Sequence, residues 1–299
     1  MDLTTRRQFL RAGAFGLAGF ASVSQQVLKL RADPLGLPIG LELYTVRQEV
    51  AKDLPGTLKK VAQVGYKEVE SGAPKNKAKA LEFRQAVADS GLVCPSLHFD
   101  WTDLQSKLGD EIEIAQTVGA TYMICSSLPD AERSIDHYRQ AAEFFNHAGE
   151  ACLKSGRLIG YHCHNFDFTS FDGVTAFDEL LRLTDPKLVG MQMDCFWVTR
   201  AGKDPVQYFK TYPGRFPPLH IKDLKPGYAP GTKTKDGPTP GNKGGTFTEV
   251  GRGVIDWKRI FAAAPEGGVK HYFVEQDFSD DSPFDSIKTS YEYLHQLQV

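Results

Sequence analysis

Short apolar runs alternate with longer amphipathic segments along the chain from Pro38 onward. The short runs have the length and apolar content of buried strands, and the longer segments repeat apolar residues at helical spacing. Glycines such as Gly65 and Gly91 follow the amphipathic segments, where glycine favours the left-handed end of a helix. The pattern predicts strands at Ile39–Tyr44, Glu68–Glu70, Val93–Phe99, Tyr122–Ser126, Leu158–His164, Leu188–Asp194, Pro218–Lys222 and Tyr272–Glu275. It predicts helices at Leu54–Val64, Lys77–Ser90, Leu104–Val118, Ile135–Ser155, Val174–Leu183, Pro205–Tyr212, Trp257–Ala263 and Asp285–Leu297.

The strict alternation of strand and helix predicts an α/β fold, a single (β/α)8 TIM barrel, over residues 33–299. Strands that are separated by helices run parallel, and eight such units fit a closed barrel better than an open doubly wound sheet. The G-x-G-x-x-G turn of dinucleotide-binding folds does not follow the first strand. In a barrel of this kind the active site lies at the carboxyl ends of the strands.

Polar residues collect at these carboxyl ends. Any one of them alone could be a packed or supporting group. The strand ends carry Tyr44, Glu70, His98, Asp100, His162, His164, Asp194, His220, Lys222, Glu275 and Asp277. Because scattered polar residues would not fall at strand ends this consistently, we expect the functional site there.

Two histidines, His162 and His164, close the fifth predicted strand. Side chains alternate along a strand, so both histidines point to the same side. Taken alone, the pair either begins a metal site or only hydrogen-bonds within a polar core. The next three strand ends add Asp194, His220 and Glu275. Imidazoles and carboxylates together suit Mn²⁺, Zn²⁺, Fe²⁺ or Co²⁺ better than Ca²⁺. We predict a divalent metal, with Mn²⁺ as the first expectation, bound by His162, Asp194, His220 and Glu275.

Composition limits the kind of partner. The chain has 299 residues, 41% of them hydrophobic and 24% charged, and a formal net charge of −2. These values are typical of a globular protein with a substantial core. Nucleic-acid-binding proteins usually carry a concentrated basic face, which this balance does not favour. We therefore expect a small-molecule partner and no nucleic acid. The five cysteines are scattered and odd in number, which indicates core residues rather than a disulfide framework.

The first 32 residues resemble a twin-arginine export signal with a spacer. Arg6 and Arg7 are followed by Phe9-Leu10 and by a short run rich in glycine and alanine. The run is too short for a stable membrane anchor, and a basic amphipathic helix is the alternative. We expect the chain to be exported by the twin-arginine machinery to the periplasm.

Several motifs together resemble the xylose-isomerase-like sugar phosphate isomerase/epimerase TIM barrels, whose relatives include inosose dehydratases and an endonuclease branch. No single motif is specific, but their order and spacing match over nearly the whole chain after the signal. The motifs are Ile39–Arg47, Gly65–Glu70, Tyr161–Asn165, Met193-Asp194, Leu219–Asp223, Gly251–Trp257 and Val274–Asp277.

The resemblance implies a metal held by Glu, Asp, His and Glu from strands five to eight. Asp194, His220 and Glu275 match this set, whereas His162 stands where the first Glu would be. In the ketose epimerases of the family, the two metal-bound glutamates act as acid and base on opposite faces of the substrate. Only Glu275 of that pair is present here, which argues against symmetric two-base epimerisation.

The chemistry expected from this set is proton transfer next to a sugar carbonyl. A divalent metal that binds a carbonyl and an adjacent hydroxyl acidifies the α-hydrogen and stabilises an enediolate. Glu70, Glu275 and His98 are the candidates for moving the proton, and Lys222 is the candidate for stabilising oxyanion charge. An ion pair between Lys222 and Asp223 is the alternative for this lysine.

The substrate is expected to be a carbohydrate. Aromatic and polar residues just past the strand ends could contact a sugar ring, although core packing explains some of them equally well. These residues are Tyr44, Trp101, His164, Phe196 and Trp197. Because phosphorylated sugars are cytoplasmic, an exported enzyme is expected to act on an unphosphorylated sugar or keto-sugar.

Three outcomes are open. The leading hypothesis is a metal-dependent isomerase or epimerase. A lyase or hydratase acting on a 3-keto-sugar or glycoside is the second, and a non-catalytic carbohydrate-binding barrel is the third. The long Gly- and Pro-rich loop at 224–250 is predicted either to cover the barrel mouth or to be a solvated insertion.

Overall fold

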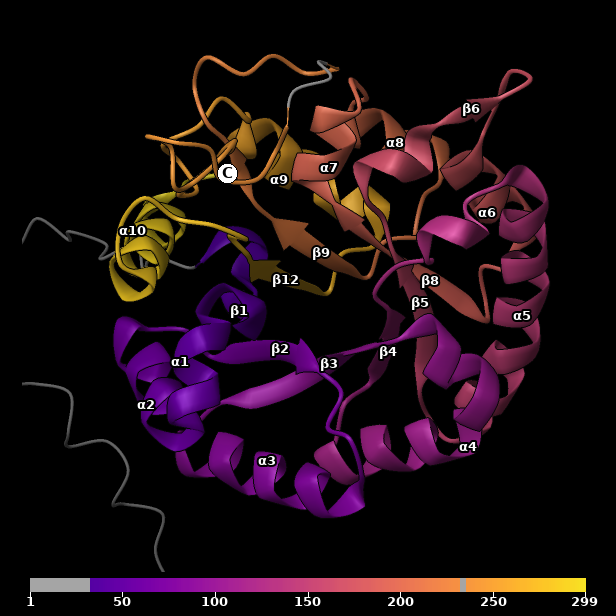
Figure 1. Ribbon diagram of the computed structural model, residues 1–299, viewed down its shortest axis with the longest axis horizontal. Coiled ribbons are helices and arrows are strands. Elements are labelled where there is room, and N and C mark those ends of the chain that lie inside the picture. Colours follow the sequence, from indigo (N-terminus) through magenta and orange to yellow (C-terminus); the bar gives the residue numbers. More distant parts are fainter. Residues whose placement is uncertain (1–32, 232–234) are drawn as a thin grey trace, which may run out of the picture. The chain divides into compact units, whose positions relative to one another are not determined.

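The computed structural model describes residues 33–231 and 235–299, which form a closed barrel of eight parallel strands (Figure 1). Around the barrel the strands follow the order β1-β12-β9-β8-β5-β4-β3-β2. The predicted TIM barrel is therefore confirmed, while the predicted export signal lies outside the described residues. The barrel strands are β1 (Gly40–Glu42), β2 (Glu68–Gly72), β3 (Val93–Phe99), β4 (Tyr122–Cys125), β5 (Leu158–His162), β8 (Val189–Asp194), β9 (Pro218–Ile221) and β12 (His271–Val274).

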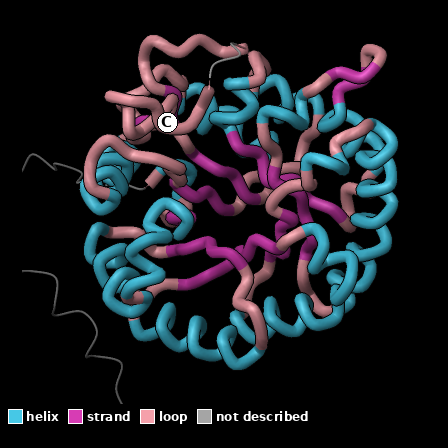
Figure 2. The backbone as a smooth tube through the Cα atoms, viewed as in Figure 1, coloured by secondary structure: helices cyan, strands magenta, loops and turns pink. Residues whose placement is uncertain are grey.

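Helices surround the strands as an outer layer (Figure 2). Their ends follow the sequence: Asn76 caps the first turn of α3 with its side chain, and Gly119 ends α4 in the left-handed conformation. No helix in the described part of the chain is long and apolar enough to cross a membrane. The helices that follow the strands are α2 (Leu54–Val64), α3 (Lys77–Asp89), α4 (Trp101–Val118), α5 (Ile135–Lys154), α6 (Ala176–Leu183), α8 (Pro205–Thr211), α9 (Trp257–Gly267) and α10 (Pro283–Gln296).

Several short elements lie outside the predicted pattern. The helix predicted from Val174 begins at Ala176, because β7 (Val174–Thr175) pairs with β6 (Ser170–Phe171) in an antiparallel hairpin. A second hairpin pairs the two ends of the long loop, β10 (Asp223–Leu224) and β11 (Phe247–Thr248). The other additions are α1 (Arg47–Lys52), α7 (Cys195–Arg200) and the 3₁₀ helices Pro34–Gly36, Leu43–Val46, Asp130–Glu132 and Asn165–Phe168.

Asp223 organises the segment that leads into α9. Its carboxylate accepts hydrogen bonds from the backbone N–H groups of Gly251, Gly253 and Ile255 and from the indole N–H of Trp257. The side chain is 1% exposed. Asp223 is thus fully engaged away from the barrel mouth and is not the partner of Lys222.

The five cysteines are all buried and unbridged. Cys163 and Cys195 flank the strand ends at β5 and β8, and both side chains are fully buried. The prediction of core cysteines without disulfides is confirmed.

A glycine pair lets β5 and β8 lie close together. Gly160 faces Gly190 in the parallel register. A Cβ at position 160 would lie 2.8 Å from the carbonyl oxygen of Gly190 and 2.8 Å from the Cδ1 atom of Ile124. The first of these neighbours is backbone, so it cannot move aside without disturbing the strand pair.

We expect Gly160→Ala to lower the free energy of unfolding by about 1–3 kcal/mol, because it overpacks the barrel wall. Gly109→Ala is the matched control, since Gly109 lies in α4 with open space where its Cβ would be. That change should raise stability by about 0.5–1 kcal/mol through helix propensity. Urea unfolding of the two variants measures both values, and equal effects would contradict the packing argument.

Candidate functional site

The four predicted metal ligands meet at the carboxyl end of the barrel. His162, Asp194, His220 and Glu275 are all buried, and one ligand atom from each lies within 4.8 Å of the others. They come from the ends of β5, β8, β9 and β12, which are consecutive around the barrel. The structure thus brings together residues that are separated by up to 113 positions in the sequence, 275 − 162.

The atoms of this group have the spacing of a ligand shell. The Oδ2 atom of Asp194 lies 3.7 Å from His162 Nε2 and 3.9 Å from His220 Nδ1. His220 Nδ1 lies 2.7 Å from the Oε2 atom of Glu275. Two imidazoles and two carboxylates are a donor set for a borderline divalent metal.

The two carboxylate oxygens of Asp194 have different surroundings. Oδ1 accepts hydrogen bonds from the backbone N–H groups of Phe196 and Trp197, at 2.9 and 3.1 Å, and so caps the N-terminus of α7. Oδ2 is buried and has no hydrogen bond within the described residues. The Lys222 ammonium, 3.2 Å away, balances part of its charge, and a cation bound by this group would give Oδ2 a further partner.

Lys222 supplies positive charge beside the same carboxylates. Its Nζ lies 2.7 Å from Glu275 Oε2, 3.2 Å from Asp194 Oδ2 and 3.0 Å from Asp277 Oδ1. Burial by itself lowers the pKa of Lys222, but the three carboxylates outweigh burial and raise the pKa well above its ordinary value. Lys222 is therefore charged, and its ammonium faces the candidate metal site.

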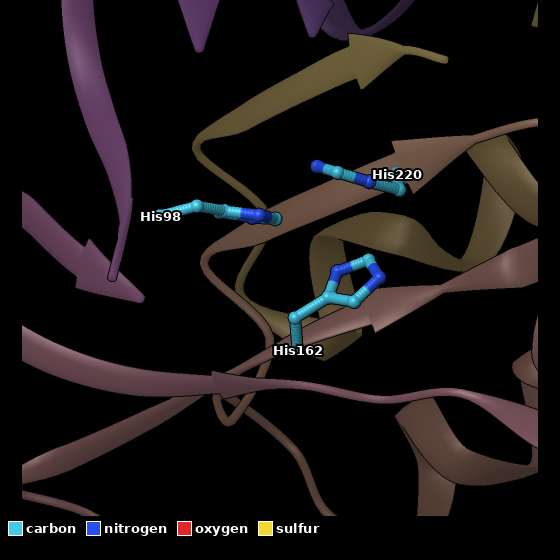
Figure 3. A group of neighbouring side chains, drawn as sticks. All are labelled: His98, His162 and His220. Atoms are coloured by element: carbon cyan, nitrogen blue, oxygen red, sulfur yellow. The ribbon is translucent and has the colours of Figure 1, made fainter. Parts of the chain in front are cut away.

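Three imidazole rings converge from β3, β5 and β9 (Figure 3). The His98 and His220 rings are stacked with centroids 5.3 Å apart, and the His162 and His220 rings are 4.5 Å apart. Burial lowers the pKa of His162 well below its ordinary value, and the neighbouring His220 lowers it further. His162 is therefore neutral, as a metal-binding imidazole must be. Burial lowers the pKa of His220, but Glu70 and Glu275 outweigh burial and raise it well above its ordinary value, so His220 must lose a proton before it binds a metal.

Glu70 lies beneath these rings and is completely buried. One oxygen accepts hydrogen bonds from Ser96 and from Gln192, and the other from His220. Burial alone would raise the pKa of Glu70, but His98 and His220 outweigh burial and lower it. Glu70, predicted to move a proton, is placed where it orients His220, as a carboxylate behind a metal-bound histidine does.

A cavity of about 670 Å³ opens over the site. Of the residues predicted to act on a substrate, its wall includes Tyr44, His98, His164, Lys222 and Glu275. This volume is ample for a small sugar or glycoside. The Nδ1 atom of His164 is buried with no hydrogen bond from the part of the chain that the structure describes, and burial lowers the pKa of His164 to about 3. His164 is thus a neutral imidazole at the cavity wall.

Of the three aromatic residues Trp101, Phe196 and Trp197, which were predicted to contact the substrate, two lie in the core and one lies near the site. Trp101 is 4% exposed, packs edge-on against Phe144 and donates its indole N–H to the carboxylate of Glu132. Phe196 is fully buried and stacks on Phe247. Both side chains therefore belong to the core. Trp197 lies closer to the site, with its ring 5.3 Å from Lys222 Nζ.

The prediction from sequence did not single out Glu42, which also lines the cavity. β1 ends at Glu42, two residues earlier than predicted, so Glu42 rather than Tyr44 holds the strand-end position. Its Oε1 accepts the backbone N–H of Tyr44, and its buried Oε2 has no hydrogen bond within the described residues. Burial, followed by the charge of Glu70, raises the pKa of Glu42 to about 8. Glu42 is therefore protonated at neutral pH and presents an O–H donor.

Comparison with known proteins gives one family and several relatives. The xylose isomerase-like TIM barrel family matches residues 58–297. An inosose dehydratase of Lacticaseibacillus casei is 30% identical over 164 residues, which are 53% of this chain and 54% of that protein. The chain thus spans about half the length of the dehydratases that it matches.

Solved structures match over a larger share of the chain. A sugar phosphate isomerase/epimerase of Parabacteroides distasonis is 25% identical, with a TM-score of 0.69 and coverage of 87% of this chain and 98% of that one. The IOLI protein, whose structure contains a zinc atom, is 15% identical, with a TM-score of 0.64 and coverage of 86% and 96%. The second of these matches supports the fold alone.

Proposed function

The chain belongs to the xylose isomerase-like TIM barrel family, and we propose that it is a divalent-metal-dependent enzyme that removes a proton next to the carbonyl of a polyhydroxylated ketone. The observation that carries the proposal is the buried group of His162, Asp194, His220 and Glu275, of which His162 and Glu275 line the cavity. The Oδ2 atom of Asp194 accepts no hydrogen bond within the described residues and has the Lys222 ammonium 3.2 Å away, so it can also bind a cation.

The metal would be held by these four residues and would polarise the carbonyl as a Lewis acid. Mn²⁺ is the first expectation, and Zn²⁺, Fe²⁺ and Co²⁺ suit the same donors. The zinc atom of the IOLI protein, a structure of the same fold, is consistent with this group of metals.

The other groups at the cavity have complementary roles in the proposal. Burial would raise the pKa of Glu275, but Lys222 and His220 outweigh burial and lower it. Its carboxylate is therefore anionic, which suits a metal ligand, and the lowered pKa makes it a weak base. The Lys222 ammonium stabilises the negative charge that develops on the carbonyl oxygen. Glu42, with its free O–H, protonates a departing hydroxyl or alkoxyl group.

We propose elimination as the outcome, in which loss of the α-hydrogen is followed by loss of a β-hydroxyl or β-alkoxyl group. Two features support it. First, the chain has His162 where the resemblance to the ketose epimerases would place a glutamate. Second, it matches inosose dehydratases over about half of their length. Isomerisation is the second candidate, supported by the isomerase/epimerase of Parabacteroides distasonis.

Incubation with keto-sugars, inososes and 3-keto-glycosides in D₂O separates the two outcomes. Elimination is expected to release water or an alcohol and to produce an unsaturated ketone with a strong ultraviolet absorbance. Isomerisation would instead place solvent deuterium on carbon in a product of unchanged elemental composition. Tight binding of these compounds without any turnover would favour a carbohydrate-binding barrel and refute the enzymatic proposal.

We also propose that the chain is exported to the periplasm by the twin-arginine route. A reporter fused to residues 1–31 is expected to reach the periplasm, whereas the same fusion with Arg6→Lys and Arg7→Lys should stay in the cytoplasm. Equal localisation of the two fusions would contradict the proposal. The paired change preserves charge, so it separates recognition of the twin arginines from a general effect of a basic N-terminus.

A further inference from the structure

Gln192 lies under the site and contacts three residues of the polar network. It belongs to β8, two residues before Asp194, and is completely buried. Its Nε2 atom lies 2.7 Å from an oxygen of Glu70. Its Oε1 atom lies 2.8 Å from His162 Nδ1 and 2.6 Å from His98 Nε2.

The orientation of the Gln192 amide follows from Glu70. An ionised carboxylate only accepts hydrogen bonds, so the amide group that faces it must be the NH₂. The amide oxygen must then point the opposite way, toward the two histidines. Ser96 also donates to Glu70, which leaves this carboxylate surrounded by donors.

The amide oxygen in turn sets the protonation of the rings. A carbonyl oxygen only accepts, so His162 Nδ1 and His98 Nε2 must each carry a hydrogen. A neutral imidazole with its hydrogen on Nδ1 has its lone pair on Nε2. The Nε2 atom of His162 is the one that faces Asp194, at 3.7 Å from Oδ2.

We propose that Gln192 is a positioning residue that holds His162 in the Nδ1–H tautomer and so directs its Nε2 lone pair at the metal. The inference rests on the proposed metal site. Glu70, Gln192 and His162 form a relay in which a carboxylate fixes an amide and the amide fixes an imidazole. The relay thus gives the site a neutral imidazole of defined orientation.

The first test is the tautomer itself. The ¹⁵N chemical shifts of His162 in the metal-free wild type, assigned by their loss in His162→Gln, should report hydrogen on Nδ1. Gln192→Met removes the acceptor at nearly constant volume and should shift His162 toward the Nε2–H tautomer. Gln192→Glu, protonated so that its O–H replaces the amide NH₂ toward Glu70, keeps an oxygen toward the histidines and should preserve the wild-type pattern.

The second test is affinity for Zn²⁺ alone, measured by competition with a chromophoric chelator. Gln192→Met is expected to weaken Zn²⁺ binding by about 10- to 100-fold, as loss of a partner behind a metal ligand typically does. Gln276→Met is the matched control, because Gln276 is also buried beside the ligands, yet its side-chain N–H bonds the carbonyl of Phe278. It should leave both the His162 tautomer and the Zn²⁺ affinity unchanged.

The outcomes separate this inference from the proposed function. A wild type that binds no Zn²⁺ refutes the metal site, whereas the tautomer of His162 still decides the role of Gln192. Hydrogen on Nε2 in the wild type overturns the inference, and so does a Gln192→Met protein with unchanged tautomer and affinity. If Gln192→Met fails to fold, the ¹⁵N shifts of the wild type and of the Gln192→Glu variant decide between the two tautomers.

Discussion

Replacing Asp194 with asparagine is expected to remove the bound divalent metal and to lower kcat/KM by about 10³-fold or more. The amide oxygen of asparagine can still cap α7 through the N–H groups of Phe196 and Trp197. What is lost is the anionic Oδ2, which has no hydrogen bond within the described residues and faces His162 and His220. Loss of Lewis-acid stabilisation of several kcal/mol corresponds to a rate change of this size.

Elemental analysis of the purified protein measures the metal directly, and it also identifies which metal is bound. The matched control is Asp204→Asn, because Asp204 likewise caps a helix, α8, through Val206 but lies outside the site and pairs with Arg259. Asp204→Asn should keep the metal and the activity. A wild type that is purified under metal-replete conditions without metal, or an Asp194→Asn protein with full metal, would refute the assignment.

Lys222→Met is expected to have the second largest effect. The change leaves the buried carboxylates of Asp194 and Glu275 and the partly buried carboxylate of Asp277 without their shared cation. Removing one partner from a buried ionic group typically costs about 3–5 kcal/mol of stability. Added divalent metal should restore part of the loss, because it binds the folded state through two of the same carboxylates. Activity should fall by about 10²- to 10³-fold even when metal is bound, since the oxyanion loses its charged partner.

Thermal or urea unfolding with and without metal measures the first effect, and steady-state kinetics at saturating metal measures the second. Lys225→Met is the control, because Lys225 forms a more exposed ion pair with Asp280. Surface pairs contribute about 0–1 kcal/mol. A Lys222→Met protein as stable as Lys225→Met would show that Lys222 does not balance the buried carboxylates.

The barrel and the convergence of the four candidate ligands could be predicted because both depend on regular patterns. Alternating strands and helices determine the topology, and the topology brings consecutive strand ends to one rim. Asp194, His220 and Glu275 each stand at such an end, so their convergence with His162 followed from strand boundaries alone. The distances among them, and the free oxygen of Asp194, depend on the three-dimensional arrangement of side chains.

Residues whose roles depend on precise boundaries were harder to predict. Glu42 lies two residues before the predicted end of its strand, because a 3₁₀ helix begins at Leu43. Trp101 was expected to face the substrate, but α4 begins at Trp101 itself and turns its ring into the core. Gln192 lies two residues before Asp194 on the same strand, which predicts that both side chains point into the barrel. Its contacts with Glu70 and His98 could not be predicted, because these residues come from distant parts of the chain.

The two oxygens of Asp194 connect the candidate cation site to the first turn of α7. One oxygen fixes the first turn of α7, and the other is free to bind a cation. Trp197 lies in that first turn, close to both Lys222 and His164. A shift of the carboxylate toward a cation therefore moves the anchor of the helix that carries Trp197. The candidate cation site and the placement of Trp197 beside Lys222 are therefore linked through the single side chain of Asp194.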